Sequence, residues 1–295
     1  MSFLSRYAVV LVGLLAIHPD ADPAQAGAML PGTPGIRPAL EGSAAMRSGE
    51  IPPAAPGSGT LGSQDLAKGF HGFGSYDWWI TAWWRWALAT PARVNPLLDP
   101  HATNCDAGRQ PRHVRFLGGN FSGGAEDPPV VRRCTVPFGT ALFFPILNAV
   151  WASTPKPNPG CEVAADPWYG SRPGDRAFGK FIRDVYVPAG KNPNNPPGSL
   201  TLTIDGKSIR GLEHLYKRSD VFFNAVIPDD NIFDATLGAD CFGRILLTPN
   251  VAWGYHAFVP PLPPGRHTLR WTADATLPIL GALHQDVTYH LTVKR

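Results

Sequence analysis

Aromatic and polar side chains gather in one Pro-rich stretch of the sequence. The stretch contains six residues of interest: Asn148, Trp151, Glu162, Asp166, Trp168 and Tyr169. Aromatic rings can stack on sugar rings, while carboxylate and amide groups bind sugar hydroxyls. We therefore expect a carbohydrate-binding surface in which the amide and the three aromatic residues contact the ligand. The alternative is an irregular loop that is held by Cys161 and binds nothing.

Catalytic residues are less clearly marked. Glycoside hydrolysis needs two carboxyl groups facing each other across a cleft, and Glu162 and Asp166 are candidates for such a pair. His256, His267 and His290 belong to segments that resemble strands, and convergence on one face would create a metal site or an acid–base group. Each histidine alone is more typical of a structural residue. The chain has no H-E-x-x-H, P-loop or G-x-S-x-G motif.

A metal ion has one candidate site. Asp229, Asp230 and Asp234 follow Pro228 closely, and Ca²⁺ takes six to eight oxygen ligands. The spacing lacks the glycine and the final glutamate of an EF-hand loop, so a polar turn with an Asx motif is the alternative. We expect no cofactor other than this calcium ion.

The four cysteines are Cys105, Cys134, Cys161 and Cys241. Their spacing matches no zinc pattern, since no two stand two to four residues apart. An even number of cysteines in an exported chain indicates disulfides, with three possible connectivities. We expect the nearest neighbours to pair, as Cys105–Cys134 and Cys161–Cys241.

The first 26 residues predict export. A positive charge at Arg6 precedes the apolar run 7–17, and Ala24-Gln25-Ala26 resembles a signal-peptidase site. The run is too short to span a membrane, so we expect a secreted or periplasmic protein with no span after cleavage. Residues 27–69 are rich in Pro, Gly and Ala and predict a flexible arm. A net charge of +3 over 295 residues does not favour nucleic acid as a partner.

Two segments have helical periodicity. Ser75–Ala89 starts at a good N-cap, ends before Pro91 and carries five of the nine tryptophans. Trp79, Trp83 and Trp86 share one face, while Trp78 and Trp84 point elsewhere, so the segment predicts a helix packed across a sheet or an aromatic platform. The stretch 175–187 predicts a second helix.

The rest of the chain reads as strands. Apolar runs or period-2 alternation mark the following segments: 113–117, 140–150, 199–204, 207–209, 221–227, 251–259, 266–272 and 286–293. Many strands separated by Pro/Gly turns predict a mainly β fold. We expect one antiparallel β-sandwich or jelly-roll domain over residues 70–295, with two accessory helices.

Four segments resemble a family of secreted bacterial proteins whose activity is uncharacterised. The segments are Trp83-Trp84-Arg85-Trp86, Cys134–Asn148 (CTVPFGTALFFPILN), Leu262–Leu269 (LPPGRHTL) and Val287–Val293 (VTYHLTV). The resemblance implies one contiguous domain, and no catalytic residue can be carried over from it.

These observations favour a secreted, non-catalytic binding protein with a polysaccharide or glycan as its ligand. One alternative is an extracellular enzyme that acts on polysaccharide through carboxylates or histidines. A second alternative is an envelope or matrix protein whose partner is another protein, for which we expect an apolar surface patch.

Overall fold

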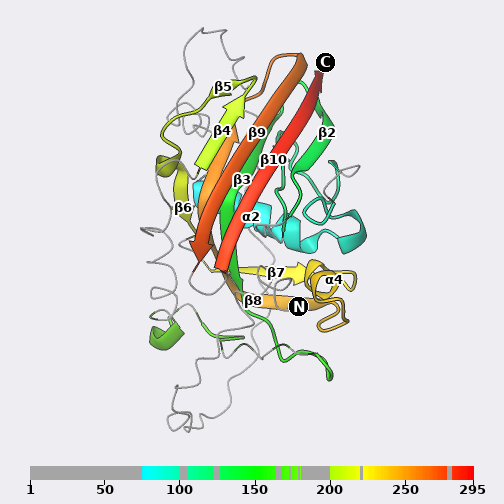
Figure 1. Cartoon of the computed structure of the whole chain (residues 1–295). Coiled ribbons are helices and arrows are strands. Elements are labelled where there is room, and N and C mark those ends of the chain that lie inside the picture. Colours follow the sequence, from blue (N-terminus) through cyan, green and yellow to red (C-terminus); the bar gives the residue numbers. More distant parts are fainter. Residues whose placement is uncertain are drawn as a thin grey trace.

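The protein consists of two stacked β-sheets with one long helix behind them, as the computed structural model in Figure 1 shows. The structure describes residues 75–99, 105–121, 127–161, 163, 166, 168–172, 174–178, 180, 200–219, 222–277 and 281–295. The predicted signal peptide and arm, together with Glu162, lie outside these residues. The mainly β fold that the sequence predicts is confirmed.

The inner sheet lies between the helix and the second sheet. Its order is β1-β3-β8-β6, and β7 also pairs with β8. Its strands are β1 (Val114–Phe116), β3 (Ala141–Ala152), β6 (Tyr216–Arg218), β7 (Phe223–Ile227) and β8 (Ile245–Val259). Strand β8 is central, because β3 pairs along one of its edges and β6 and β7 pair along the other. The apolar residues on both faces of this strand predict that position.

The outer sheet has the order β2-β10-β9-β4-β5. Its strands are β2 (Val130–Pro137), β4 (Leu200–Ile204), β5 (Lys207–Ser208), β9 (Gly265–Leu277) and β10 (Gly281–Lys294). Most pairs in both sheets are antiparallel, but β1 runs parallel to β3 and β2 runs parallel to β10. Both sheets are therefore mixed, which the sequence does not indicate.

Two cores hold the layers together. The core between the sheets includes Phe144, Trp271 and Tyr289, whose rings stack in sequence: Phe144 on Trp271 at 4.7 Å and Trp271 on Tyr289 at 5.6 Å between centroids. The core behind the inner sheet includes Trp79 and Phe143. Alternation along each inner strand supplies both cores, because successive side chains point to opposite faces.

Helix α2 (Tyr76–Ala89) starts and ends where the sequence predicts. The Ser75 side chain accepts a hydrogen bond from the Trp78 backbone N–H, which caps the first turn. Four of its tryptophans are buried and Trp78 is 45% exposed, so the helix packs across the inner sheet rather than forming an open platform. Trp84 is also buried, because strand β7 contacts the helix.

The short elements lie around the sheets. They are the 3₁₀ turns η4 (Ala92–Val94) and η5 (Leu212–Leu215) and the helix α4 (Ile232–Leu237). The predicted helix over 175–187 lies mostly outside the described residues. Its first residue, Asp175, accepts hydrogen bonds from the backbone N–H groups of Ala177 and Phe178, as an N-cap does. No helix in the described part of the chain is both long and apolar enough to cross a membrane.

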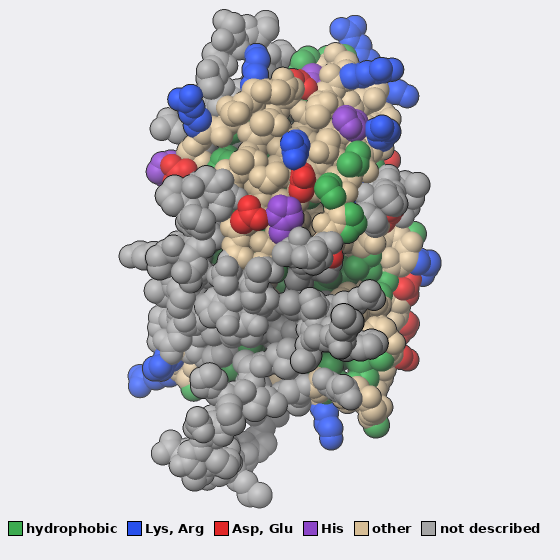
Figure 2. Space-filling model, in the orientation of Figure 1, with side chains coloured by type: hydrophobic (Ala, Val, Ile, Leu, Met, Phe, Trp, Pro, Cys, Tyr) green, Lys and Arg blue, Asp and Glu red, His purple; other side chains and the backbone are tan. Residues whose placement is uncertain are grey.

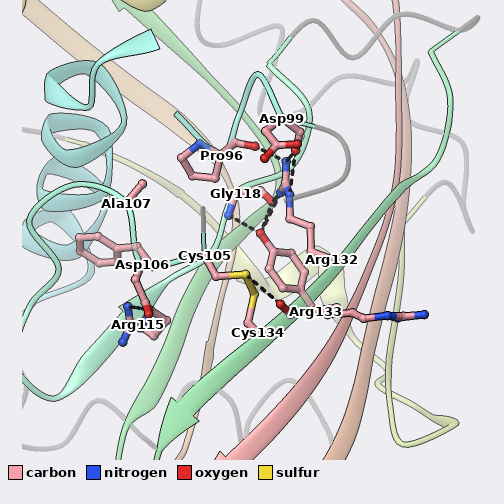
Figure 3. The surroundings of a disulfide bond; sticks show 12 residues. Pro96, Asp99, Cys105, Asp106, Ala107, Arg115, Gly118, Arg132, Arg133 and Cys134 are labelled. Carbon is pink, nitrogen blue, oxygen red and sulfur yellow. Dashed lines mark hydrogen bonds and ion pairs between the residues drawn. A yellow bond between two sulfur atoms is a disulfide. The ribbon is translucent and has the colours of Figure 1, made fainter. Parts of the chain in front are cut away.

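Both predicted disulfides are confirmed. Cys105 bonds to Cys134 and Cys161 bonds to Cys241, with Cα separations of 5.8 and 5.7 Å. The first ties the segment before β1 to β2 in the other sheet, and Figure 3 shows its surroundings. The second closes a loop of about 80 residues and joins the segment after β3 to the turn after α4. Disulfides persist in oxidising compartments, so they are consistent with an extracellular protein.

Arg132 is a charged residue in the core. It lies on β2 among inward-facing apolar residues and is 1% exposed. Its guanidinium donates hydrogen bonds to the backbone carbonyls of Pro96 and Asp99 and to those of residues 118 and 119, and it also donates to the Tyr289 hydroxyl. Figure 3 shows this convergence beside the Cys105–Cys134 disulfide. Arg132 therefore joins two loops to the outer sheet.

Candidate functional site

The predicted ligand residues meet only in part. Trp151 ends strand β3, while Trp168 and Tyr169 belong to a loop that crosses the start of β8. Val150 and Ala152 pack in the core behind the inner sheet, so Trp151 faces the other way. Asn148 lies three residues before Trp151 and therefore shares the face of Val150. The structure thus separates Asn148 from the aromatic residues.

Trp151 is fully buried, and this corrects one prediction. A side chain with no exposed surface cannot stack on a sugar at the surface, so Trp151 supports the loop from below. The burial is favourable because a large aromatic side chain removes much apolar area from water. Trp168 is half-buried against Phe178, with ring centroids 5.6 Å apart. Of the predicted aromatic contacts, Tyr169 is the exposed one, with 40% of its surface accessible.

Asp166 organises this loop. The residue is 6% exposed, and its carboxylate accepts a hydrogen bond of 2.8 Å from the Trp168 backbone N–H. Burial raises the pKa of Asp166, while the Trp168 backbone N–H and the nearby polar groups of Ser153, Trp151 and Thr154 oppose that rise. The carboxyl group therefore lies beside the end of β3. It is a positioning residue for the aromatic pair that follows it.

Further contacts fix Tyr169 beside strand β8. Its hydroxyl donates to the Leu246 carbonyl at 3.3 Å, and the next backbone N–H, of Gly170, donates to the Thr248 carbonyl at 2.9 Å. The Tyr169 N–H donates to the Asp166 carbonyl, which closes a turn. The ring is thus exposed, its hydroxyl is bonded to β8, and two backbone hydrogen bonds hold the loop that carries it.

Two exposed aliphatic side chains lie on strands β7 and β8. Val226 on β7 pairs directly with Leu246 on β8, and they are 45% and 43% exposed. Both face away from α2, because the alternate residues on these strands pack in the core behind the inner sheet. Beside them the Thr248 hydroxyl donates to the Asn224 side-chain oxygen at 2.7 Å. We call Tyr169, Val226, Leu246, Asn224 and Thr248 the Tyr169 surface.

The three aspartates are not arranged as a calcium site. Both oxygens of the Asp234 carboxylate accept backbone N–H groups from the turn of residues 241–243. Asp230 pairs with Arg93 at 2.7 Å, and Asp229 accepts the backbone N–H of Arg244. Among the described residues, no group of three His, Cys, Asp or Glu side chains is arranged to hold a metal ion.

The Asx motif that the sequence suggests as the alternative is present at Asn231, and it begins a short helix. Asn231 is the N-cap of α4, and its side-chain oxygen accepts the backbone N–H groups of Phe233 and Asp234. The helix ends at Gly238, which adopts a left-handed conformation with φ of 68°. The aspartates therefore stabilise a helix and the turn after it.

The three histidines do not converge. His256 is fully buried on the α2 side of β8, and its ring stacks on Phe143 with centroids 5.7 Å apart. His267 bonds to Asp205 at 2.7 Å, and His290 is exposed on the outer face of β10. Burial lowers the pKa of His256 to about 3, so the ring is neutral near pH 7. A neutral, enclosed imidazole in this place is a structural residue.

Comparison with known proteins finds no similar sequence or structure. No protein-family model, curated protein or solved structure matches the chain. The resemblance to secreted bacterial proteins therefore remains a prediction, and the site is interpreted from its own geometry.

Proposed function

We propose that the protein is a non-catalytic binding protein that recognises carbohydrate at the Tyr169 surface. The observation that carries the proposal is an exposed aromatic ring held by hydrogen bonds next to exposed aliphatic side chains. A fixed ring loses little conformational entropy when a ligand stacks on it. The Asn224 and Thr248 side chains add polar atoms within the same surface, where sugar hydroxyls would bind.

We expect Tyr169→Ala to weaken binding about tenfold, which corresponds to about 1.4 kcal/mol. Stacking supplies most of the contact area in this proposal, and alanine removes it. The measurement is a depletion assay of the chain without its predicted signal peptide against a panel of insoluble polysaccharides. Soluble sugar released into the same tubes is measured in parallel.

Trp78→Ala is the matched control for this experiment. Trp78 is also an exposed aromatic residue, but it lies on α2 and not at the Tyr169 surface. The control should bind like the wild type. Equal binding by Tyr169→Ala and the wild type would exclude the Tyr169 surface as the binding site. Release of soluble sugar would show that the protein is an enzyme and would overturn the proposal of a non-catalytic function.

The exposed pair of Val226 and Leu246 favours a second candidate function, contact with another protein. Exposed apolar side chains in direct cross-strand contact are typical of interaction surfaces. In that case Val226→Lys would abolish association with the partner protein. The polysaccharides would not deplete the wild-type protein from solution.

A further inference from the structure

The outer face of the outer sheet is polar and carries no covering helix in the described part of the chain. Figure 2 shows this face as a broad area of mostly polar side chains above the grey region. Along β2 the residues alternate, with Val130, Arg132 and Cys134 buried and Arg133 and Thr135 exposed. The exposed residues of neighbouring strands lie side by side and therefore form rows across the sheet.

On this face, the charged side chains that form ion pairs and those that do not lie toward opposite ends of the strands. Toward the start of β10, the basic side chains have acidic partners: Arg270 contacts both carboxylate oxygens of Asp286 at 3.1 Å, and His284 contacts Asp274 at 2.7 Å. Toward the end of β10, the exposed cations Arg133, Arg266 and Lys294 form no ion pair within the described residues. The exposed His290 lies among them. We call Arg133, Arg266, His290 and Lys294 the basic end.

The strand register brings the basic end together. Arg133 on β2 is directly opposite His290 on β10, which is directly opposite Thr268 on β9. The next row contains Thr135, Thr292 and Arg266, and Lys294 follows. With strands about 4.8 Å apart and about 3.4 Å per residue, the cations and hydroxyls occupy an area of roughly 10 by 14 Å. Figure 2 shows blue side chains gathered at this end of the molecule, where Figure 1 places the C-terminus.

Nearby carboxylates neutralise only part of the positive charge in this area. Asp205, at the turn between β4 and β5, is the acidic side chain nearest in the register. Its two carboxylate oxygens already bond to the His267 ring and to the Thr268 backbone N–H. The exposed Arg295 follows Lys294 directly and adds a further cation. The area therefore keeps an excess of positive charge that a polyanion would complement.

We propose that the basic end binds a linear polysaccharide that bears carboxylate or sulfate groups. The cations would contact the anionic groups, and the threonine hydroxyls between them would bond to the sugar hydroxyls. Duplex nucleic acid fits less well, because a flat sheet face does not enter a groove. The basic end is distinct from the Tyr169 surface, since β3 starts near the former and ends near the latter.

The test is binding of dextran sulfate, polygalacturonate, neutral dextran and duplex DNA to the chain, at low and high salt. The wild type should bind a charged polysaccharide more tightly than DNA or neutral dextran, and salt should weaken that binding. A triple variant removes the three unpaired cations: Arg133→Gln, Arg266→Gln and Lys294→Gln. It should bind the charged polysaccharide about tenfold more weakly, and with less dependence on salt.

A second triple variant is the control, because it changes the net charge equally at exposed positions away from the basic end. Its substitutions are Lys156→Gln, Arg176→Gln and Arg244→Gln. It should lose at most about threefold in affinity. Equal losses in the two variants, no loss in the first, or tighter binding of DNA than of either charged polysaccharide would overturn the proposal. Tyr169→Ala should bind the charged polysaccharides like the wild type, so the two surfaces are tested separately.

Discussion

Replacing Arg132 with methionine is expected to lower the free energy of unfolding by about 3–5 kcal/mol. Methionine replaces the aliphatic part of the side chain but has no donor, so the carbonyls that Arg132 contacts in the loops at 96–99 and 118–119 lose a partner. A buried acceptor without a hydrogen bond carries its full desolvation cost. Tyr289 retains only its own bonds with Gly118. The measurement is urea unfolding followed by tryptophan fluorescence.

Arg133→Met is the matched control, because Arg133 is the next residue on β2 and points to solvent. We expect its unfolding free energy to change by no more than about 0.5 kcal/mol. Arg132→Lys should also be destabilised, since an ammonium lacks the planar fork that reaches several carbonyls at once. Equal midpoints for Arg132→Met and Arg133→Met would show that the buried guanidinium contributes nothing to stability.

His256 is expected to make the protein sensitive to acid. Its folded pKa is about 3 and its ordinary value is 6.5, because burial disfavours the charged ring. The unfolded state therefore binds the proton more readily, and stability is fully present above pH 6.5 and falls as the pH drops toward 3. Between pH 7 and pH 4 the loss from this one residue is about 3 kcal/mol.

The measurement compares unfolding free energies of the wild type and His256→Leu at pH 7 and pH 4. The variant loses the hydrogen bond between Nδ1 and the Gly254 carbonyl and the stacking on Phe143, so it should be the less stable protein at pH 7. The difference between the two proteins should then shift by about 3 kcal/mol in favour of the variant at pH 4. Parallel curves for the wild type and His256→Leu would contradict the assignment.

Strong periodic patterns in the sequence predicted their elements well. Strand β10 has regular alternation and α2 has a cap, a stop and an apolar face, so local signals agree with the final packing. Strand β2 was not predicted, because Arg132 occupies an inward position and interrupts the apolar alternation. The parallel pairing of β2 with β10 has no local signal either, since the partners lie far apart in the chain.

The candidate site was predicted less completely than the fold. The Pro-rich stretch does place Trp151, Asp166, Trp168 and Tyr169 near one another, as the contacts of Asp166 show. The sequence could not separate Tyr169, which is exposed, from Trp151, which is buried, because exposure depends on which strands lie beside the loop. Val226 and Leu246 were not singled out, since each is ordinary in its own strand and they meet through the pairing of β7 with β8.

The parallel pairing of β2 with β10 also constrains the order of folding. Strand β2 has no other neighbour in its sheet within the described part of the chain, and residues 138–280 separate it from β10. A ribosome must therefore release the segment up to Lys294 before the sheet can close, and such distant contacts form slowly. Until then β2 has an unpaired edge that a chaperone would have to shield from aggregation. Chains that stop before Gly281 should not reach the native state.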